Sequence, residues 1–240
     1  MNIALARIRN RMLQLRVRGR SLDPQSQANL AALNGLRLEE PARDHRFVVL
    51  DLETTGLDPA KDRVVSVGAF RVVGGRVRLG DVFCELCNPG RDIPVESIKV
   101  HAIVPDMIAG ARPAWEVFGD FLAYLGSDII VAHYAPFDLH FLNRVMKARA
   151  GFALQNLVLD TVELCRSLLL RPDPYGVYTD FKKCSLDALA EMFDVEVPER
   201  HTALGDALAT ALVFQRLLLK AEQTQRGSLR EVIRMGAAVP

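Results

Sequence analysis

The stretch Phe47-Val48-Val49-Leu50-Asp51-Leu52-Glu53-Thr54-Thr55-Gly56-Leu57 decides the fold of this 240-residue chain. Its first four residues form a continuous apolar run, which is typical of a strand buried on both faces. Side chains alternate across a strand, so Asp51 and Glu53 are expected to point to one face. Two carboxylates held side by side repel each other unless a cation lies between them. Taken alone, the same triplet is equally typical of an exposed acidic turn.

A second cluster, His133-Tyr134-Ala135-Pro136-Phe137-Asp138, follows the apolar run 128–132, which predicts another buried strand. Pro136 suits the first position of a helix, where its missing donor costs nothing. Asp138 then falls in the first helical turn, where the helix N-terminus favours negative charge. On its own, Asp138 is better interpreted as an ordinary helix-start acid.

The third cluster, His201-Thr202-Ala203-Leu204-Gly205-Asp206, opens a helix expected to run from Thr202 to about Ala221. Asp206 lies among small residues that leave room for a cation. His201 precedes the helix, and a histidine with a pKa near neutrality can accept a proton at working pH. A lone histidine at such a place is usually a surface residue. The three clusters together favour a site that holds two divalent cations around a phosphodiester.

The order and spacing of these clusters resemble the DEDDh exonucleases, the family that includes the proofreading epsilon subunit of bacterial DNA polymerase III. The resemblance covers about residues 46–221. It implies that the metal ligands are Asp51, Glu53, Asp138 and Asp206, and that the general base is His201. It also implies substrate contacts from Thr54, Thr55, Leu57, His101, His133 and Phe137. For Phe137, packing in the core is an equally good interpretation.

Two departures from the family pattern stand out. Tyr134 occupies the position where the family commonly has Asn, which puts the contacts to the terminal nucleotides in question. Ala102 and Val104, next to His101, replace the usual Gly and Thr. The four carboxylates are all present, so the metal site is expected to be intact.

The function implied is a 3′–5′ exonuclease that hydrolyses single-stranded nucleic acid, DNA favoured, to nucleoside monophosphates, in proofreading or repair. The expected cofactors are two Mg²⁺ or Mn²⁺ ions, because the ligands are carboxylates without thiolates. The expected partners are single-stranded DNA or RNA 3′ ends and, as an open alternative, a DNA polymerase. Two rival functions are an RNA-processing 3′–5′ exoribonuclease and a non-catalytic polymerase-associated subunit, whose signature would be a lost carboxylate.

The pattern of elements predicts an α/β fold, a ribonuclease H-like mixed five-stranded sheet flanked by helices. Residues 1–45 are expected to form a basic, helical extension, 46–222 the exonuclease domain, and 223–240 a C-terminal tail. The expected strands are 46–51, 64–73, 76–87, 128–133 and 157–160. The expected helices include 114–125, 136–149, 185–193 and 202–221, and residues 171–176 are a loop by composition.

Residues 1–46 are basic, with nine Arg and four acids, a net charge of +5. The whole chain carries +1, so residues 47–240 carry +1 − 5 = −4. An apolar stripe at helical spacing runs through Met1, Leu5, Ile8, Met12 and Leu15. Three interpretations compete: a helix packed on the domain or on a second copy, an arm for nucleic acid or a partner, and a targeting sequence. The oligomeric state stays open.

The remaining composition points to a cytoplasmic protein without a membrane partner. No stretch approaches the roughly 20 apolar residues of a membrane span. The four cysteines, Cys84, Cys87, Cys165 and Cys184, indicate a reducing cytoplasm. Cys84 and Cys87 have zinc-like spacing, but residues three apart on a strand face opposite sides, which disfavours zinc. The near-neutral charge excludes a strongly basic duplex binder.

Overall fold

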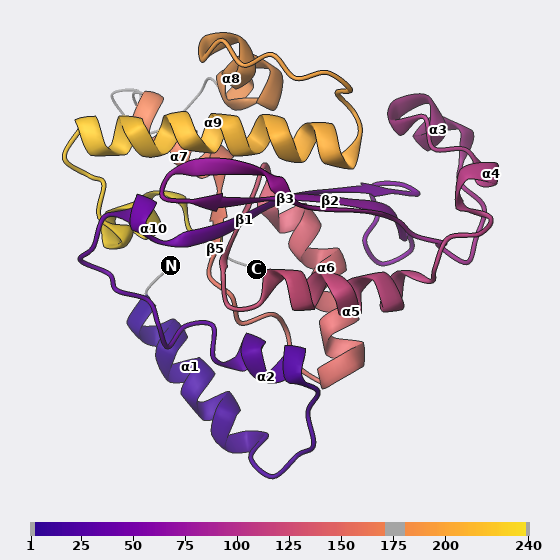
Figure 1. Ribbon diagram of the computed structural model, residues 1–240, viewed down its shortest axis with the longest axis horizontal. Coiled ribbons are helices and arrows are strands. Elements are labelled where there is room, and N and C mark those ends of the chain that lie inside the picture. Colours follow the sequence, from indigo (N-terminus) through magenta and orange to yellow (C-terminus); the bar gives the residue numbers. More distant parts are fainter. Residues whose placement is uncertain (1–2, 171–180, 239–240) are drawn as a thin grey trace.

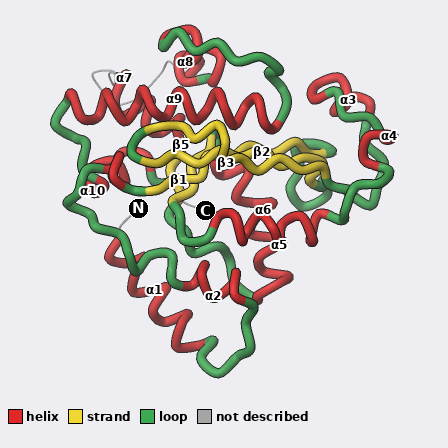
Figure 2. Tube along the Cα trace, in the orientation of Figure 1, coloured by secondary structure: helices red, strands yellow, loops and turns green. Residues whose placement is uncertain are grey.

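The computed structural model describes residues 3–170 and 181–238 and is built on a mixed five-stranded sheet (Figures 1 and 2). The strand order is β3-β2-β1-β4-β5. β1 pairs antiparallel with β2, and β2 with β3, whereas β1, β4 and β5 are parallel neighbours. The strands are β1 Arg46–Thr54, β2 Val64–Val73, β3 Arg76–Leu86, β4 Ile129–Ala132 and β5 Val158–Asp160. The predicted fold class is confirmed. The loop predicted at 171–176 lies outside the described residues.

The central strand β1 is buried on both faces, as its apolar run predicts. Phe47, Val48, Val49 and Leu50 are 0% exposed. Phe47 and Val49 belong to the core under α9 (Ala203–Gln223), where Phe47 meets Phe214 with ring centroids 4.9 Å apart. Val48 and Leu50 belong to the opposite core, which α5 (Ala114–Leu125) and α6 (Ala135–Ala150) cover. Figure 1 shows α9 on one face of the sheet and α5 and α6 on the other.

The other helices predicted between the strands and after them are present, with sharper boundaries than the periodicity gave. Ser185 and Thr202 cap the N-termini of α8 (Leu186–Met192) and α9 with their hydroxyls, so each helix begins one residue later than predicted. α7 (Thr161–Leu169) begins directly after β5, and the short helix η2 covers Phe181–Cys184. Two short helices were not anticipated, α3 (Val95–His101) and α4 (Pro105–Ile108).

The N-terminal extension is helical, as expected, and packs on the domain through an unexpected face. It contains α1 (Ile3–Arg16), α2 (Pro24–Leu30) and the turn η1 (Ala42–Asp44). The side chains of α1 that are buried are Ile3 and Asn10. The stripe on which the packing interpretation relied is exposed instead, with Leu5 at 47%, Ile8 at 57%, Met12 at 65% and Leu15 at 63%.

The C-terminal segment is not a free tail. Residues 229–236 form α10 (Leu229–Gly236), whose Leu229, Val232 and Ile233 are buried in the same core as α9. The backbone N–H of Ala238 donates to the carbonyl of Val158 in β5 (3.1 Å), so the chain end is tied to the sheet. The prediction of a separate tail at 223–240 is therefore corrected: the apolar side chains of α10 belong to the core of the domain.

The cysteines do not behave alike. Cys165, at the middle of α7, and Cys184, at the end of η2, are joined by a disulfide, which a reducing compartment does not lead one to expect. Cys84 is exposed and Cys87 is buried, so the two do not share a face. Within residues 3–170 and 181–238, no helix could cross a bilayer.

Candidate active site

Two strand carboxylates and one helix carboxylate converge at the C-terminal end of β1. Asp51 and Glu53 point to the same side of the strand, and Asp206 reaches them from the first turn of α9. One oxygen from each of the three lies within 4.8 Å of the other two. The predicted alternation along β1 therefore brings together residues from two distant parts of the chain.

Gly68 makes this meeting possible. It lies in β2 directly opposite Asp51 in the antiparallel register. A Cβ at Gly68 would come within 2.3 Å of the carbonyl group of Ala203 and 2.4 Å of the backbone nitrogen of Leu204. Only a residue without a side chain lets the first turn of α9 rest on the sheet there. The start of α9, and with it Asp206, is placed by that contact.

The cluster is electrostatically unfavourable when no cation is bound. Burial raises the pKa of Asp51 well above its usual range, and the neighbouring charges of Asp138, Glu53 and Asp206 add to the effect. Burial, together with the charge of Asp206, raises the pKa of Glu53 to about 8. A divalent cation bound between these carboxyl groups stabilises their ionised form, because it compensates the clustered negative charges.

Asp138 lies in the first turn of α6, as predicted, and is only 3% exposed. Burial is the main reason why its pKa is raised, and its charge acts in turn on Asp51. Its oxygens are not within the group of mutual 4.8 Å contacts that the other three acids form. Asp138 therefore borders the cluster, and it is electrostatically coupled to it.

Arg200 is a residue of the site that sequence reasoning missed. Its Nε donates to Oδ1 of Asp206 at 2.5 Å, and its Nη1 donates to Asp187 of α8 at 2.6 Å. The only sequence signal was its position immediately before His201. His201 is exposed, has a left-handed backbone (φ 62°), and its N–H donates to Asp206 at 3.3 Å. The predicted base thus lies next to the acids on an exposed loop.

The threonines after Glu53 are occupied within the turn that follows β1. Thr54 Oγ1 donates to the carbonyl of Gly56 at 2.7 Å. Thr55 is 1% exposed, and its Oγ1 donates to Asp62 at 3.0 Å. These hydroxyls shape the turn, and Leu57 in the same turn is 86% exposed. Among these three predicted substrate contacts, Leu57 is the side chain presented to solvent.

His101, at the end of α3, is 3% exposed. Its Nδ1 accepts a hydrogen bond from the N–H of Ile103 at 3.0 Å. Its buried Nε2 has no hydrogen bond of regular geometry to another described residue. Burial lowers the pKa of His101, and the backbone of Thr54 partly offsets this, which places the ring next to the turn after β1.

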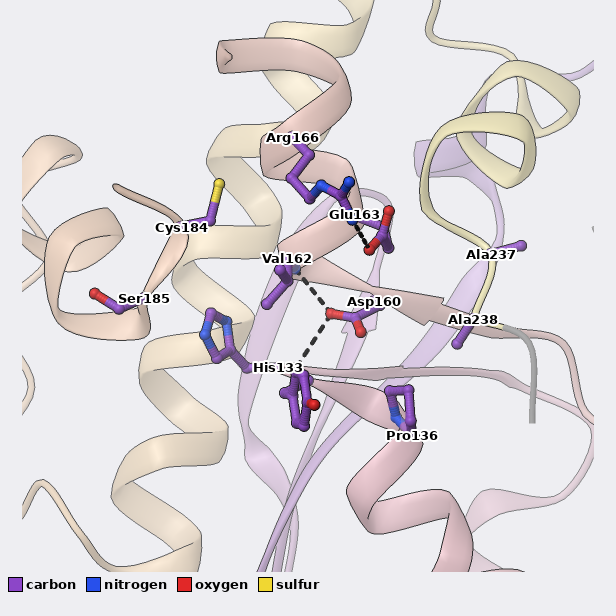
Figure 3. A pocket seen from close by; sticks show the side chains of 11 residues that line it. His133, Pro136, Asp160, Val162, Glu163, Arg166, Cys184, Ser185, Ala237 and Ala238 are labelled. Atoms are coloured by element: carbon purple, nitrogen blue, oxygen red, sulfur yellow. Dashed lines mark hydrogen bonds and ion pairs between the residues drawn. The ribbon is translucent and has the colours of Figure 1, made fainter. Parts of the chain in front are cut away.

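Asp160 organises the turn between β4 and α6 and was also missed. It ends β5, is 4% exposed, and accepts hydrogen bonds from the backbone N–H groups of Tyr134, Ala135 and Val162 at 2.8–3.1 Å. Figure 3 shows it between this turn and the start of α7. Burial raises its pKa to about 6, although the three N–H donors act in the opposite direction. The predicted strand end at residue 160 was the available signal.

His133 lies beside a cavity of about 730 Å³ (Figure 3). The cavity is also lined by Tyr134, Glu163, Arg166, Ser185 and Ala237. Nδ1 of His133 is 2.9 Å from the hydroxyl of Thr161. Burial, with the positive charge of Arg200, lowers the pKa of His133 to about 4, so the ring is neutral at physiological pH.

Phe137 is half-buried and stacks edge-on against Phe141 of the core, with ring centroids 5.2 Å apart. The structure therefore gives Phe137 the packing contact that was the alternative to a substrate contact. The side chain of Phe137 is partly exposed, and Phe137 directly precedes Asp138 in the sequence.

The donor set fits hard divalent cations. All the converging ligand atoms are carboxylate oxygens, two of the carboxyl groups have raised pKa values, and no thiol joins them. Oxygen ligands suit Mg²⁺ and Mn²⁺. The residues that could hold them are the three converging acids, with Asp138 at their border.

A family model described as exonuclease matches residues 48–214, which include all four acids and His201. The chain belongs to this exonuclease family. The chain is 35% identical over 183 residues to the DNA polymerase III subunit epsilon of Aquifex aeolicus, covering 76% of this chain and 85% of that one. It is 44% identical over 183 residues to a DNA polymerase III subunit epsilon-like protein of Rhodobacter capsulatus, covering 75% of this chain.

The chain spans only a part of most of these relatives. It covers 25% of the Rhodobacter capsulatus protein and 12% of the PolC-type DNA polymerase III of Thermotoga maritima, to which it is 37% identical over 175 residues, 73% of this chain. Among solved structures, it shares its fold with Exonuclease X in complex with 5′ overhanging duplex DNA (TM-score 0.57, 22% identity, 78% of this chain and 98% of that one). It also shares its fold with Escherichia coli Exonuclease I in complex with a dT13 oligonucleotide (TM-score 0.61, 17% identity, 75% of this chain and 42% of that one).

The two departures of this chain from its family's pattern both lie at left-handed backbone positions. Ala102 has φ 57° where the family usually has Gly, and Tyr134 has φ 63° where it commonly has Asn. Gly and Asn enter this conformation readily, whereas a bulky side chain does so rarely. At Tyr134 the phenol is 64% exposed beside the cavity.

Proposed function

We propose that this chain is a metal-dependent 3′–5′ exonuclease that removes nucleoside monophosphates from single-stranded nucleic acid, with DNA favoured. The observation that carries the proposal is the convergence of Asp51, Glu53 and Asp206 within 4.8 Å, with His201 on the adjoining loop. A cluster whose carboxyl groups resist ionisation suits the binding of cations, and an exposed histidine beside it suits proton transfer.

In this mechanism, Asp51, Glu53, Asp206 and Asp138 hold two Mg²⁺ or Mn²⁺ ions. Bound, these ions supply the positive charge that stabilises the phosphodiester and its leaving oxygen. His201, on its exposed loop, accepts the proton of the attacking water at Nδ1 or Nε2. The exposed Leu57 contacts the terminal nucleotide, and the buried His101 supports the turn after β1 from beneath. His133, neutral at physiological pH, lies next to the β4–α6 turn.

The preference for single-stranded ends and for DNA is supported by the relatives and by the charge. The DNA polymerase III names of the relatives favour DNA and a role in proofreading or repair, in contact with a polymerase in the cytoplasm. The net charge of −4 on residues 47–240 does not suit a broad grip on duplex phosphates. A single strand needs no broad basic surface if it enters the acid cluster, because the bound cations neutralise the acids there.

The proposal is tested with matched DNA and RNA oligonucleotides labelled at the 5′ end, incubated with Mn²⁺ or with chelator. We expect a ladder of shortened DNA products that requires the metal and that forms more slowly from RNA. Release of label as a mononucleotide from the 5′ end at the first time point would show the opposite polarity and overturn the direction.

Two variants separate the proposed roles. Asp206→Asn removes one ligand charge and should abolish hydrolysis, together with most of the Mn²⁺ binding seen by calorimetry. His201→Ala should bind Mn²⁺ as the wild type does, while hydrolysis slows by roughly 10²–10⁴-fold. Wild-type turnover in Asp206→Asn contradicts the metal site, and wild-type turnover in His201→Ala contradicts the base.

A further inference from the structure

The helix α1 has one face buried against the domain and, on its other side, a line of exposed apolar side chains. Successive residues of an α-helix are rotated by about 100°, which places Ile3 and Asn10 about 180° from the middle of the line formed by Leu5, Ile8, Met12 and Leu15. The first face is buried against the domain. The second, called here the outer stripe, has side chains that are 47–65% exposed.

The covered face holds α1 firmly in place. Asn10 is 2% exposed and donates to Gln155 Oε1 at 3.1 Å. Gln14 donates to the carbonyl of Leu30 at 2.8 Å, and Arg7 to that of Leu36 at 2.6 Å. These contacts come from side chains on the inner face, so the outer stripe points away from the domain. In Figure 1, α1 lies at the margin of the molecule, on the opposite side of the sheet from α9.

The outer stripe is flanked by unpaired positive charge. Arg9, Arg11, Arg16, Arg18 and Arg20 are exposed, and none forms an ion pair with a residue in the part of the chain that the structure describes. Arg9 and Arg16 lie on one side of the stripe and Arg11 on the other, by the same 100° rotation. No acid occurs before Asp23, and Asp23 itself is paired with Arg149 at 3.2 Å.

We propose that the outer stripe and its arginines dock on an anionic lipid surface. An occupant of this face has to cover aliphatic side chains and neutralise arginines at the same time. Nucleic acid would meet the arginines, but the stripe contains no aromatic ring on which a base could stack. A second copy would cover the stripe, but it would bring two sets of arginines together.

A bilayer with acidic headgroups meets both requirements. Basic helices with one apolar face lie in the plane of a membrane surface, with the apolar side chains among the acyl chains and the arginines at the headgroups. The outer stripe is the part of α1 farthest from the domain, so a flat surface can reach it without rearrangement of α1. The expectation that membranes play no part rested on the lack of a spanning segment, and adsorption requires none.

The experiment measures binding of the full chain to vesicles by co-sedimentation. One set consists of phosphatidylcholine and the other contains about a third of phosphatidylglycerol. We expect binding to the anionic vesicles that weakens as salt is raised to about 0.5 M, where charges are screened over a few ångströms. Equal binding to both vesicle types, or to neither, overturns the proposal.

Matched variants assign the binding to α1. Ile8→Gln with Met12→Gln should lower binding by about tenfold or more, because two apolar contacts are lost. Each of Arg9→Gln and Arg16→Gln should lower it by about fivefold. Leu79→Gln with Leu219→Gln removes two apolar side chains of similar exposure elsewhere (69% and 49%) and should change nothing.

Two further measurements on the same proteins test the alternative occupants, a second copy of the chain and nucleic acid. Light scattering that shows a dimer in the wild type and a monomer in Ile8→Gln with Met12→Gln assigns the stripe to a second copy. Retention of single-stranded DNA that falls in Arg9→Gln, without any change in vesicle binding, assigns the arginines to nucleic acid. The variants lie outside the candidate active site, so each should hydrolyse a short oligonucleotide at the wild-type rate.

Discussion

At the scale of single residues, the pair formed by Arg200 and Asp206 has the most direct chemical consequence. A guanidinium 2.5 Å from Oδ1 of Asp206 supplies the acid cluster with positive charge when no metal is bound. A divalent cation that binds Oδ1 of Asp206 has to displace the guanidinium of Arg200 from this oxygen. Asp187 offers Arg200 a second carboxylate, so the guanidinium can leave Asp206 without losing every partner.

Replacing Arg200 by Gln should therefore raise the affinity for Mn²⁺ by about tenfold, because the competing charge is removed. Calorimetric titration without nucleic acid measures this directly. Arg230→Gln is the matched control, since Arg230 pairs with Glu39 on the surface, and its loss should leave the affinity unchanged. Weaker Mn²⁺ binding in Arg200→Gln would show that the arginine supports the ligands.

Glu53 predicts how pH and metal removal act together. In the metal-free protein its pKa is about 8, against an ordinary value of 4.5, so the folded state binds the proton more tightly than the unfolded chain. The contribution of Glu53 to stability is thus fully present below pH 4.5 and is lost as the pH rises through 8. Mn²⁺ compensates the charge that appears, so its effect on stability should grow over the same range.

The measurement is the melting temperature with Mn²⁺ and with chelator at several pH values. The increase produced by Mn²⁺ should be larger at the alkaline end than at the acidic end. In Glu53→Gln the metal-free protein should melt at a higher temperature at alkaline pH than the wild type. A Mn²⁺ effect that is the same at every pH would contradict the raised pKa.

At the scale of elements, the contact between β2 and α9 decides whether the site forms. Gly68→Ala places a methyl group 2.3 Å from the backbone of Ala203, and backbone cannot yield as a flexible side chain can. We expect α9 to shift, a loss of roughly 1–3 kcal/mol in the free energy of unfolding, and a large drop in hydrolysis as Asp206 moves away.

Gly80→Ala is the control, because Gly80 lies in the neighbouring strand β3 and a Cβ there meets no atom within 4 Å. Chemical denaturation and the rate of oligonucleotide hydrolysis, measured on both variants, separate the two positions. If Gly68→Ala and Gly80→Ala behave alike, close packing of α9 on the sheet is not what places Asp206.

Elements with long or strongly patterned sequences could be predicted, and short or isolated ones could not. The run Phe47–Leu50 predicted β1, and β1 alone aligned Asp51 with Glu53. α4 has four residues, too few for a helical period to show. α10 carried a readable stripe, with Leu229, Val232 and Ile233 at helical spacing, but it lies beyond the segment that resembles the family.

The sequence was enough to single out the candidate site residues, but not the residues that contact them. The four acids and His201 could be singled out because a local motif marks each of them, and the structure brings three of the acids together. Arg200 and Asp160 act through partners that are distant in sequence or on other elements, and Asp160 binds a turn 25 residues away. The outer stripe was found as a pattern, but which face of α1 the domain covers depends on partners such as Gln155, which no local pattern reveals.

At the scale of the whole molecule, the N-terminal extension is part of the folded body and remote from the acids. Deleting residues 1–20 removes the buried Ile3 and Val17 and the bond between Asn10 and Gln155. We expect the melting temperature to fall by about 5–10 °C, with hydrolysis of a short oligonucleotide nearly unchanged below that temperature.

Ile8→Gln with Met12→Gln is the control for this deletion, since both side chains are more than half exposed and should not affect the melting temperature. A truncated chain that melts like the wild type would show that α1 contributes nothing to the stability of the domain.

The central place of β1 in the sheet has a consequence for the order in which the molecule opens. Its amides pair with both β2 and β4 and lie between two cores, so their hydrogens should exchange with solvent only in the rarest openings. His201 lies on an exposed loop, where we expect amide hydrogens to exchange much sooner. We therefore expect the two parts of the site to open on different timescales. The strand that carries Asp51 and Glu53 should stay closed while the loop that carries His201 opens many times.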